Sequence, residues 1–277
     1  MPEQDGFEFR RRIRNRPRGV RSGGVNFVIP RRYVEQDHEL AITIRFISNR
    51  KLFGECYSRL RSEYFRESAE PRGIFLLPIV PTDHLCPGQT KPGDVDLLAV
   101  PYEGDEIDLR NVMAMEVKVI RARFQKQGRS PNDLGLSQAK SLLDRGFPRV
   151  ALAHLIVADE SPEEAWREVG VAQILDEEDH VEMLEPQRID LMPFDLMRRG
   201  YGRLEARCDD DRIGLLCAYV KRAGCMDQDA LRRSSVWQPV GRNAPFNESY
   251  SPTLLERVAA YFEKNAWAFL DNPAFDP

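Results

Sequence analysis

The segment Met113-Ala114-Met115-Glu116-Val117-Lys118-Val119-Ile120 has the clearest alternation of apolar and charged residues in the chain. In an extended strand, successive side chains point to opposite faces of the sheet. One face of this stretch is therefore apolar, with Met and Val at alternate positions, and the other face carries Glu116 and Lys118. The stretch predicts a strand with a packed face and a face on which two opposite charges project together.

A second apolar segment, Val95 to Val100, precedes this strand, and the glycine of the intervening Glu103-Gly104-Asp105-Glu106 marks a turn. If the hairpin turns near Asp105, residues whose numbers sum to about 212 lie opposite each other, which sets Asp96 across from Glu116. Directly opposed Cβ atoms are about 4.5–5.5 Å apart. Two carboxylates at that distance repel unless a cation lies between them, and oxygen ligands suit magnesium or manganese rather than zinc. The spacing therefore predicts a metal site.

The segments around the hairpin have the periodicities of an α/β protein. Leu40 to Ile47 alternates in the manner of a strand, and Ser48 is a candidate N-cap for a helix after it. The expected order over about 49 to 158 is helix, strand, strand, strand, helix, strand. Apart from the hairpin, the elements are a helix at about 49 to 67, a strand at Ile74 to Leu77, a loop with Asp83 and His84, a helix at Leu134 to Arg145 with Gly146 at C′, and a strand at Val150 to Val157.

Charge is partitioned along the 277 residues, whose formal net charge is −4. Residues 1–32 hold nine arginines against Glu3, Asp5 and Glu8, whereas the stretch from Asp159 to Glu185 is dominated by acidic residues. Basic segments suit a polyanion such as nucleic acid. A solvated arm is the equally weighted alternative, and the Pro and Gly residues of this segment predict flexibility until it meets a partner.

Cysteine usage and hydropathy exclude several protein classes. The five cysteines have no paired C-x-x-C spacing, so neither a disulfide framework nor a thiolate zinc site is indicated. The longest apolar runs, such as Val150 to Val157, are far shorter than the roughly 20 residues of a membrane-spanning helix. The Arg-rich start lacks the apolar segment of a signal peptide. We therefore expect a cytoplasmic protein that does not enter a membrane.

The C-terminal part is expected to be mostly helical. An acidic helix or linker is expected from Asp159, followed by helices at about 211–223 and 252–270, with Ser251 as N-cap and Pro252 at N1 of the last one. The expected organisation is a basic arm at 1–38, a core at 39–158 and a mostly helical region at 159–277 packed on that core.

Two motifs resemble those of the PD-(D/E)XK nuclease superfamily. Gly93-Asp94-Val95-Asp96-Leu97-Leu98-Ala99 is similar to its G-x-[IV]-D strand, and Glu116-Val117-Lys118 is similar to its E-x-K. The expected order of elements over about 49 to 158 is also similar to the αβββαβ core of that superfamily. The resemblance implies a restriction-endonuclease-like mixed sheet and metal-dependent hydrolysis of phosphodiester bonds, by water attack at a magnesium- or manganese-bound phosphate. It favours DNA over RNA and implies a role in defence, repair or mobile-element processing.

The same resemblance assigns roles to individual residues. It implies metal binding by Asp96 and Glu116, by the backbone carbonyl of Val117 and by Glu55 of the first helix. Lys118 would orient the water or offset charge on the phosphate, and Asp94 offers a further acidic group beside Asp96. An ordinary surface ion pair with Arg59 is the alternative for Glu55.

Further residues are expected around this site. Gln138 and Lys140, in the helix after the E-x-K strand, resemble polar residues that some branches of the superfamily point at the site, although an exposed helix face explains them equally, and Lys140 more readily. The basic residues that follow the strand would bind phosphate or form a surface loop; they are Arg121, Arg123, Lys126 and Arg129. His84 and His154 have no partner at ligand spacing.

Two functional alternatives stay open. The competing hypothesis is a catalytically inactive subunit that keeps the nuclease fold and binds nucleic acid or serves as a scaffold. A metal-independent hydrolase ranks last, because the sequence shows no assembled pair of nucleophile and base. The chain has no G-x-x-x-x-G-K-[ST] phosphate loop, so ATP-driven translocation would need another subunit. A homodimer is expected where two sites cut two strands, and membership of a larger complex is the other expected assembly.

Overall fold

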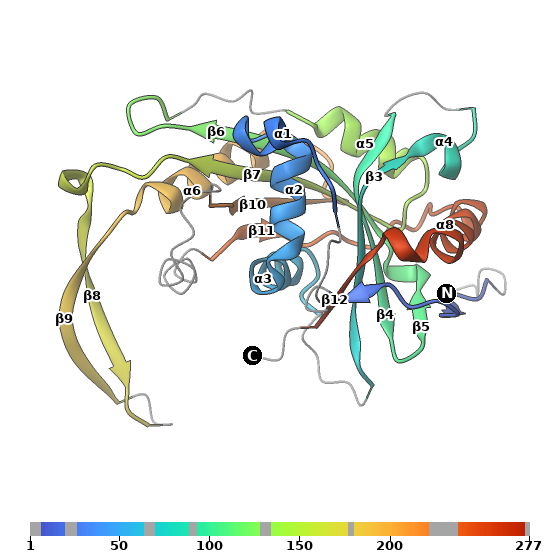
Figure 1. Cartoon of the computed structure of the whole chain (residues 1–277), viewed down its shortest axis with the longest axis horizontal. Helices are drawn as coiled ribbons and strands as arrows, with labels where there is room; N and C mark the ends of the chain where they lie inside the picture. The colour runs from blue at the N-terminus through green and yellow to red at the C-terminus, as the bar shows by residue number, and fades with distance from the viewer. Residues whose placement is uncertain are drawn as a thin grey trace.

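The computed structural model describes residues 7–19, 27–63, 70–88, 93–127, 134–176, 180–221 and 238–274. These segments form an α/β structure in which helices pack on a mixed, mostly antiparallel sheet (Figure 1). The predicted fold class is confirmed at this level. Within the same segments, no helix combines the length and apolar character that a membrane crossing requires.

Over the described residues, the main sheet has ten strands. Its central path runs in the order β11 (Val240–Arg242), β10 (Ile213–Tyr219), β7 (Arg149–Ala158), β6 (Met113–Ala122), β4 (Asp94–Glu103), β3 (Arg72–Pro81), β12 (Leu270–Pro273) and β2 (Arg18–Gly19). Two short strands, β1 (Arg10–Arg12) and β5 (Glu106–Asp108), pair with each other, and β5 also pairs with β4. The pairs β6–β7, β7–β10 and β12–β2 are parallel, and the others are antiparallel. Strands β7 and β10 are buried almost throughout, which explains their continuous apolar sequences.

Helices cover both faces of this sheet. Alternate residues of β6 belong to different cores, since Ala114 packs in one cluster and Met113 and Met115 pack in the other. The first core includes α5 (Leu136–Asp144) and α8 (Pro252–Asn265), and the second includes α2 (Glu39–Ser48) and α3 (Arg50–Leu60). A smaller third cluster joins α6 (Met192–Glu205) to β7 and β10. The short helices are α1 (Arg31–Glu35) and α4 (Thr82–Leu85), with 3-10 turns η1 (Leu109–Asn111), η2 (Glu163–Ala165) and η4 (Ala266–Ala268).

The predicted antiparallel pairing of these two segments and its register are confirmed, but the turn near Asp105 joins β4 to β5, and β5 and η1 lie in the connection to β6. Leu97 lies opposite Met115, and Leu98 lies opposite Ala114, which is the register that places Asp96 across from Glu116 one step further along. The turn contains Gly104, whose φ of +58° is readily adopted by glycine. The predicted order of elements from α3 to β7 is present, with α4, β5 and η1 inserted between its members.

Two helix ends are also confirmed. Gly146 follows α5 with a φ of +89°, the left-handed conformation expected at C′. Ser251 caps α8 by accepting a hydrogen bond from the Leu254 amide at 3.2 Å, and Pro252 occupies the first helical position.

The segment from Leu40 to Ile47 is helical, so the strand predicted there is wrong. Its buried residues include Ile42 and Phe46, which are four apart and belong to one helix face, while Ile44 is only half-buried. Over so few positions, the same apolar residues fit the two-residue period of a strand and the 3.6-residue period of a helix. Ser48 is the last residue of α2, and the N-cap of α3 is Asn49, whose side chain accepts a hydrogen bond from the Leu52 amide at 3.1 Å.

The prediction of a mostly helical C-terminal region is wrong. Residues 213–219 form β10 rather than a helix, because this apolar run is buried between the parallel strand β7 and β11. The acidic segment after Asp159 forms two long strands, β8 (Arg167–Ile174) and β9 (Val181–Ile189). Among the longer elements described in this region, only α6 and α8 meet the helical expectation. Three strands of this region, β10, β11 and β12, belong to the main sheet. The C-terminal region is therefore part of the same sheet as the predicted core and does not form a separate layer packed on it.

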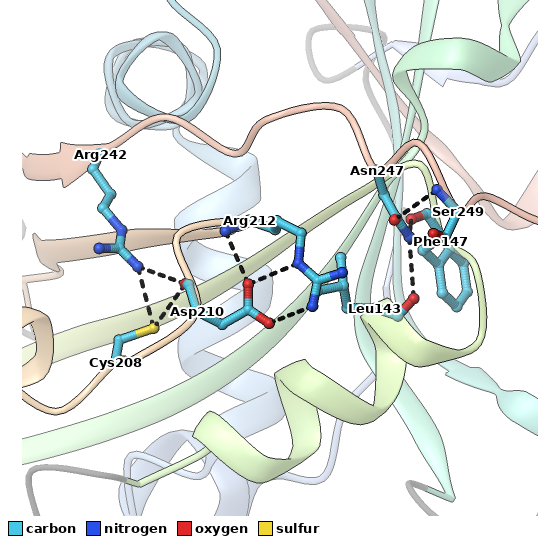
Figure 2. A network of polar contacts seen from close by, with 8 residues as sticks. All are labelled: Leu143, Phe147, Cys208, Asp210, Arg212, Arg242, Asn247 and Ser249. Carbon is cyan, nitrogen blue, oxygen red and sulfur yellow. Dashed lines mark hydrogen bonds and ion pairs between the residues drawn. The ribbon is translucent and has the colours of Figure 1, made fainter.

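A polar network holds the entry to β10 in place (Figure 2). Arg212 forms an ion pair with Asp210 at 2.7 Å, and the Arg242 guanidinium of β11 donates to the Asp210 carbonyl at 2.9 Å and contacts the Cys208 sulfur at 3.2 Å. Nearby, the buried Asn247 side chain donates to the carbonyls of Leu143 and Phe147 (Figure 2). These contacts tie the segment between α6 and α8 to the end of α5.

The basic arm is ordered over residues 7–19, against the expectation of a flexible segment. Four of its six arginines bind carboxylates of the same chain. The pairs are Arg10 with Glu103 at 3.1 Å, Arg11 with Glu256 at 2.5 Å, Arg14 with Glu263 at 2.9 Å and Arg16 with Asp271 at 3.2 Å. Packing of Phe9 against Tyr250, with ring centroids 5.3 Å apart and the ring planes tilted by 53°, adds an apolar contact that the charge pattern did not reveal.

Candidate active site

Asp96, Glu116 and Lys118 meet on adjacent strands, as the register predicts. The Lys118 Nζ lies 2.6 Å from Glu116 Oε1 and 3.5 Å from Asp96 Oδ2. Asp96 Oδ2 also accepts a hydrogen bond from the Val117 amide at 2.8 Å, which fixes the carboxylate of β4 against the backbone of β6. The Val117 side chain is buried in the core, and the role expected for its carbonyl stays a prediction.

A fourth residue, Glu39, joins this cluster and was missed in the sequence. It lies in the first turn of α2, and its Oε1 is 3.7 Å from Lys118 Nζ. Because Leu40 to Ile47 was predicted as a strand, Glu39 lay outside the predicted elements, and nothing in the sequence directed its side chain toward β4 and β6. The signal was the pair of acidic residues Asp37 and Glu39 just ahead of an apolar run, which is typical of a helix N-terminus.

Burial and charge shift the protonation of the cluster. Burial raises the pKa of Glu116 to about 7, and the nearby charge of Asp96 acts in the same direction. Burial also raises the pKa of Glu39. For Lys118, burial acts to lower the pKa, but the contacts with Glu116, Asp96 and Glu39 outweigh it and the pKa is raised. The lysine therefore stays an ammonium, and the carboxylates share its charge.

The donor set suits a hard divalent cation. Glu116 Oε1 is fully buried and accepts no well-aligned hydrogen bond, so its nearest partner is the Lys118 ammonium. Carboxylate oxygens of this kind are the ligands that magnesium and manganese prefer. In the described segments, no three side chains of Asp, Glu, His or Cys converge tightly enough to form a metal-binding group by themselves. Lys118 instead contacts all three carboxylates, so a metal held by them would share them with its ammonium.

The N-terminus of α5 lies against the cluster. Gly135, the residue before α5, has a φ of +91°, and a Cβ there would lie 2.7 Å from Leu152 Cδ1 and 3.2 Å from Glu116 Cγ. Only glycine adopts this positive φ without strain and also has no Cβ to fill the occupied space. The amide end of a helix carries partial positive charge, so this end of α5 favours negative charge near Glu116 and Lys118.

His154 holds this connection in place. It lies opposite Lys118 in the parallel ladder between β6 and β7, and its Nε2 is 2.9 Å from the Leu134 carbonyl oxygen. Burial lowers the pKa of His154, which favours the neutral ring. The residue thus fixes the chain just before Gly135, a structural role that agrees with the absence of ligand spacing in the sequence.

The strand β3 is strained beside Asp96. Pro78 lies opposite Leu97 and Val80 lies opposite Val95, while Ile79, the residue between them, has a φ of +54° and is 42% exposed. A β-branched residue in the left-handed region is unusual and costs free energy. The strained residue thus carries a partly exposed apolar side chain.

Glu55 lies away from the position expected for it. Its charged neighbours are Lys51, 4.0 Å away in the same helix, and Arg59, and burial raises its pKa. No interaction in the described segments joins it to Asp96, Glu116 or Lys118, so the surface alternative describes it better.

The remaining polar residues expected at the site are Gln138, Lys140 and Asp94. Gln138 is half-buried in the first turn of α5, and Lys140 is exposed. Asp94 is exposed at the start of β4, opposite Pro81 rather than within the cluster. Neither Gln138 nor Asp94 contacts the cluster in the part of the chain that the structure describes.

The basic run after β6 has mixed surroundings. Arg121 donates to the Asp37 carbonyl at 2.5 Å, and Arg123 pairs with Asp159 at 3.5 Å. Lys126 is exposed and its backbone pairs with Arg123. Arg129 lies outside the described residues.

Comparisons with protein families, with curated proteins and with solved structures found no match for this chain.

Proposed function

We propose that this chain is a metal-dependent nuclease of the PD-(D/E)XK type that hydrolyses phosphodiester bonds, with DNA as the preferred substrate. The observation that carries the proposal is the contact of Lys118 with Asp96 and Glu116 on adjacent strands. The succession of α3, β3, β4, β6, α5 and β7 supports a restriction-endonuclease-like core (Figure 1).

The carboxylates would hold the metal. Asp96 and Glu116 are the ligands implied by the resemblance, and Glu39 takes the place of the helical glutamate that the resemblance assigned to Glu55. A bound magnesium or manganese ion supplies Lewis-acid stabilisation of the phosphate and lowers the pKa of a water. The Val117 carbonyl remains the expected fourth protein ligand.

Protein groups around the carboxylates would orient the substrate. Lys118, released in part from its carboxylate partners when a metal neutralises them, offsets negative charge that develops on the phosphate. The N-terminus of α5 adds partial positive charge on the same side. Arg123 and Lys126, both exposed after β6, are suited to hold the phosphate backbone.

One observation favours a second candidate function. Lys118 contacts all three carboxylates, which is the arrangement of a closed ion-pair network as well as of a catalytic site. A nuclease-fold subunit that binds nucleic acid without cutting it would keep these contacts and have no need of a metal.

Cleavage assays separate the two functions. Supercoiled plasmid, single-stranded DNA and RNA are each incubated with the protein in magnesium, in manganese and in chelator. We expect metal-dependent cleavage that falls at least about 100-fold in Lys118→Ala and in Asp96→Asn. Lys264→Ala, an exposed lysine at the end of α8, is the matched control and should cleave at the wild-type rate.

Two outcomes would count against the nuclease. Equal cleavage by wild type and Lys118→Ala would show that the cluster does not act in catalysis. DNA binding by the wild type without cleavage in either metal would favour the non-catalytic subunit.

A further inference from the structure

The short helix α1 carries an aromatic side chain that serves no hydrophobic core. Tyr33 is half-buried and belongs to none of the three core clusters of the described residues. No other residue of α1 is buried either. Tyr33 instead stacks on His38, also half-buried, with ring centroids 3.9 Å apart and ring planes only 9° from parallel. We name Tyr33 and His38 the ring pair, which lies at the surface and takes no part in core packing.

The ring pair adjoins the candidate active site. His38 is the residue before Glu39, and consecutive Cα atoms are about 3.8 Å apart. Glu39 Oε1 lies 3.7 Å from Lys118 Nζ, so the next residue along the chain already contacts the cluster. A nucleic-acid strand with a phosphate at Lys118 would therefore have a neighbouring base within reach of the ring pair.

Three contacts fix the ring pair relative to the cluster. His38 Nδ1 accepts a hydrogen bond from the Leu40 amide at 3.2 Å and so caps α2. The His38 amide donates to the Tyr33 carbonyl at 2.8 Å. Between the rings in sequence, Asp37 has a φ of +48°, and its carbonyl accepts a hydrogen bond from the Arg121 guanidinium of β6 at 2.5 Å. The rings therefore have a set orientation and need little rearrangement to accept a ligand.

The charges on α1 suit a nucleotide at the ring pair. Arg32 is exposed, and its guanidinium carbon lies 5.5 Å from the centroid of the Tyr33 ring. Within the described segments, Arg32 forms no ion pair, whereas Glu35, the acidic residue of α1, is paired with Arg31 at 2.7 Å. Aromatic rings beside an arginine are the combination on which unpaired bases stack while their phosphates are held.

We propose that the ring pair is a stacking platform for an unpaired base next to the scissile phosphate, and that the chain prefers single-stranded DNA to a continuous duplex. This inference rests on the proposed nuclease function, to which it adds the substrate class. In a duplex, each base is stacked within the helix, so it reaches a protein ring only if it leaves that stack. An unpaired base has a free face, and stacking on an aromatic ring tolerates every base. The platform therefore selects the structure of the substrate rather than its sequence.

Binding in the absence of cleavage is the first test. Labelled oligodeoxythymidylate, alone or paired with oligodeoxyadenylate, is titrated with the protein in chelator, and fluorescence anisotropy gives the dissociation constants. The wild type should bind the single strand more tightly than the duplex. Tyr33→Leu keeps an apolar side chain and loses the ring, so single-strand binding should weaken at least about fivefold and duplex binding should change less than about twofold. Unchanged single-strand binding by Tyr33→Leu would overturn the proposal, as would a wild type that binds both forms equally.

Two matched variants separate stacking from a loss of structure. Tyr33→Phe retains the ring and should bind the single strand as the wild type does. His38→Asn removes the other ring but keeps a side chain that caps helices well, so α2 stays in place and single-strand binding should weaken as in Tyr33→Leu. Thermal unfolding of Tyr33→Leu should match that of the wild type, because Tyr33 belongs to no core cluster of the described residues. A Tyr33→Phe variant as weak as Tyr33→Leu would exclude stacking as the cause.

A fluorescent base reports the contact itself. The fluorescence of 2-aminopurine is quenched when the base stacks on an aromatic ring, so an oligothymidylate that carries it should lose more fluorescence on binding the wild type than on binding Tyr33→Leu. Equal quenching by the two proteins would count against the platform.

The outcome for the platform is distinct from the outcome for the nuclease. Metal-dependent cleavage together with equal single-strand binding by wild type and Tyr33→Leu would keep the nuclease and overturn the platform. Single-strand binding that depends on Tyr33, without cleavage in either metal, would keep the platform and favour the non-catalytic subunit.

Discussion

Replacement of Glu116 by Gln should stabilise the protein in a pH-dependent way. Burial and the charge of Asp96 raise the pKa of Glu116 to about 7, from an ordinary value of 4.5. Because the folded-state value is the higher one, the folded protein binds the proton more tightly than the unfolded chain does. Stability is therefore complete below about pH 4.5 and is lost as the pH rises toward 7, where the folded state must ionise a buried carboxyl.

The size of the effect follows from the two pKa values. At about 1.4 kcal/mol per pH unit, the rise from 4.5 to about 7 corresponds to roughly 3 kcal/mol of lost stability at pH 8. For 277 residues at about 2.1 cal/mol/K per residue, the entropy of unfolding is about 0.6 kcal/mol/K, so Tm should differ by roughly 5 °C.

The assay is thermal unfolding of wild type and Glu116→Gln from pH 4.5 to 8.5 in chelator. The difference in Tm should open between pH 4.5 and 7 in favour of the variant and stay constant above that. Glu248→Gln removes an exposed carboxylate and should show no such opening. A gap in Tm that does not vary with pH would contradict this account, because a carboxyl that titrates at different pH in the folded and unfolded states must make the gap vary with pH.

Magnesium supplies an internal check on the same samples. A ligand at ten times its dissociation constant stabilises the folded state by roughly 1.4 kcal/mol. Magnesium should therefore raise the Tm of the wild type by about 2 °C at pH 8 and leave Glu116→Gln nearly unchanged. Equal shifts in both proteins would place the metal elsewhere.

Three further substitutions test the local backbone. Gly135→Ala should lower the free energy of unfolding in a urea titration by about 1–3 kcal/mol and reduce cleavage, because its Cβ would meet Leu152 and Glu116 at a φ of +91°. Gly202→Ala in α6 has open space around it and should be neutral or stabilising in the same titration. Ser251→Ala should cost about 1 kcal/mol in urea unfolding through loss of the α8 cap, and an unchanged midpoint would contradict the capping role. Ile79→Gly should gain about 1 kcal/mol in calorimetry by relief of the positive φ, whereas a loss would mean that its side chain contributes more than the strain costs.

The sequence predicted the part of the site that depends on strand geometry. Alternation placed Glu116 and Lys118 on one face, and antiparallel pairing centred near Asp105 gave the register that brings Asp96 to them, although the turn at Gly104 itself joins β4 to β5. Both inferences use local rules, a period of two and a short connection, which tertiary packing rarely overrides.

The rest of the site depended on choices that the sequence left ambiguous. Ile42 and Phe46 fit a strand and a helix equally, and the wrong period concealed Glu39. Glu55 has the residue type of a ligand, but its place on α3 directs it to Lys51 and Arg59. Gly135 could not be assigned to the site from the sequence, because it approaches Glu116 of β6 and Leu152 of β7 only in the folded structure.

The prediction of a mostly helical C-terminal region was wrong for a related reason. The apolar run from Ile213 to Tyr219 has the length of a strand or of a buried helix, and only its parallel pairing with β7 decides between them. In β8 and β9, the abundance of acidic residues suggested a solvated helix, whereas Val, Ile and a cross-strand partner for nearly every residue favour the hairpin.

The two ends of the main sheet also bear on how the protein avoids aggregation. The outermost strands on its central path are β2, with two residues, and β11, with three, and each carries an arginine, Arg18 and Arg242. So short and charged an edge offers few open amide and carbonyl groups to a strand from another molecule. The strands of the hairpin β8–β9 are longer and lack this protection. Only Pro186 and the glutamates of β9 disfavour pairing of this strand with a strand from another molecule. Fibril formation on mild heating should therefore start at this hairpin, and neutralising Glu182 and Glu185 should hasten it.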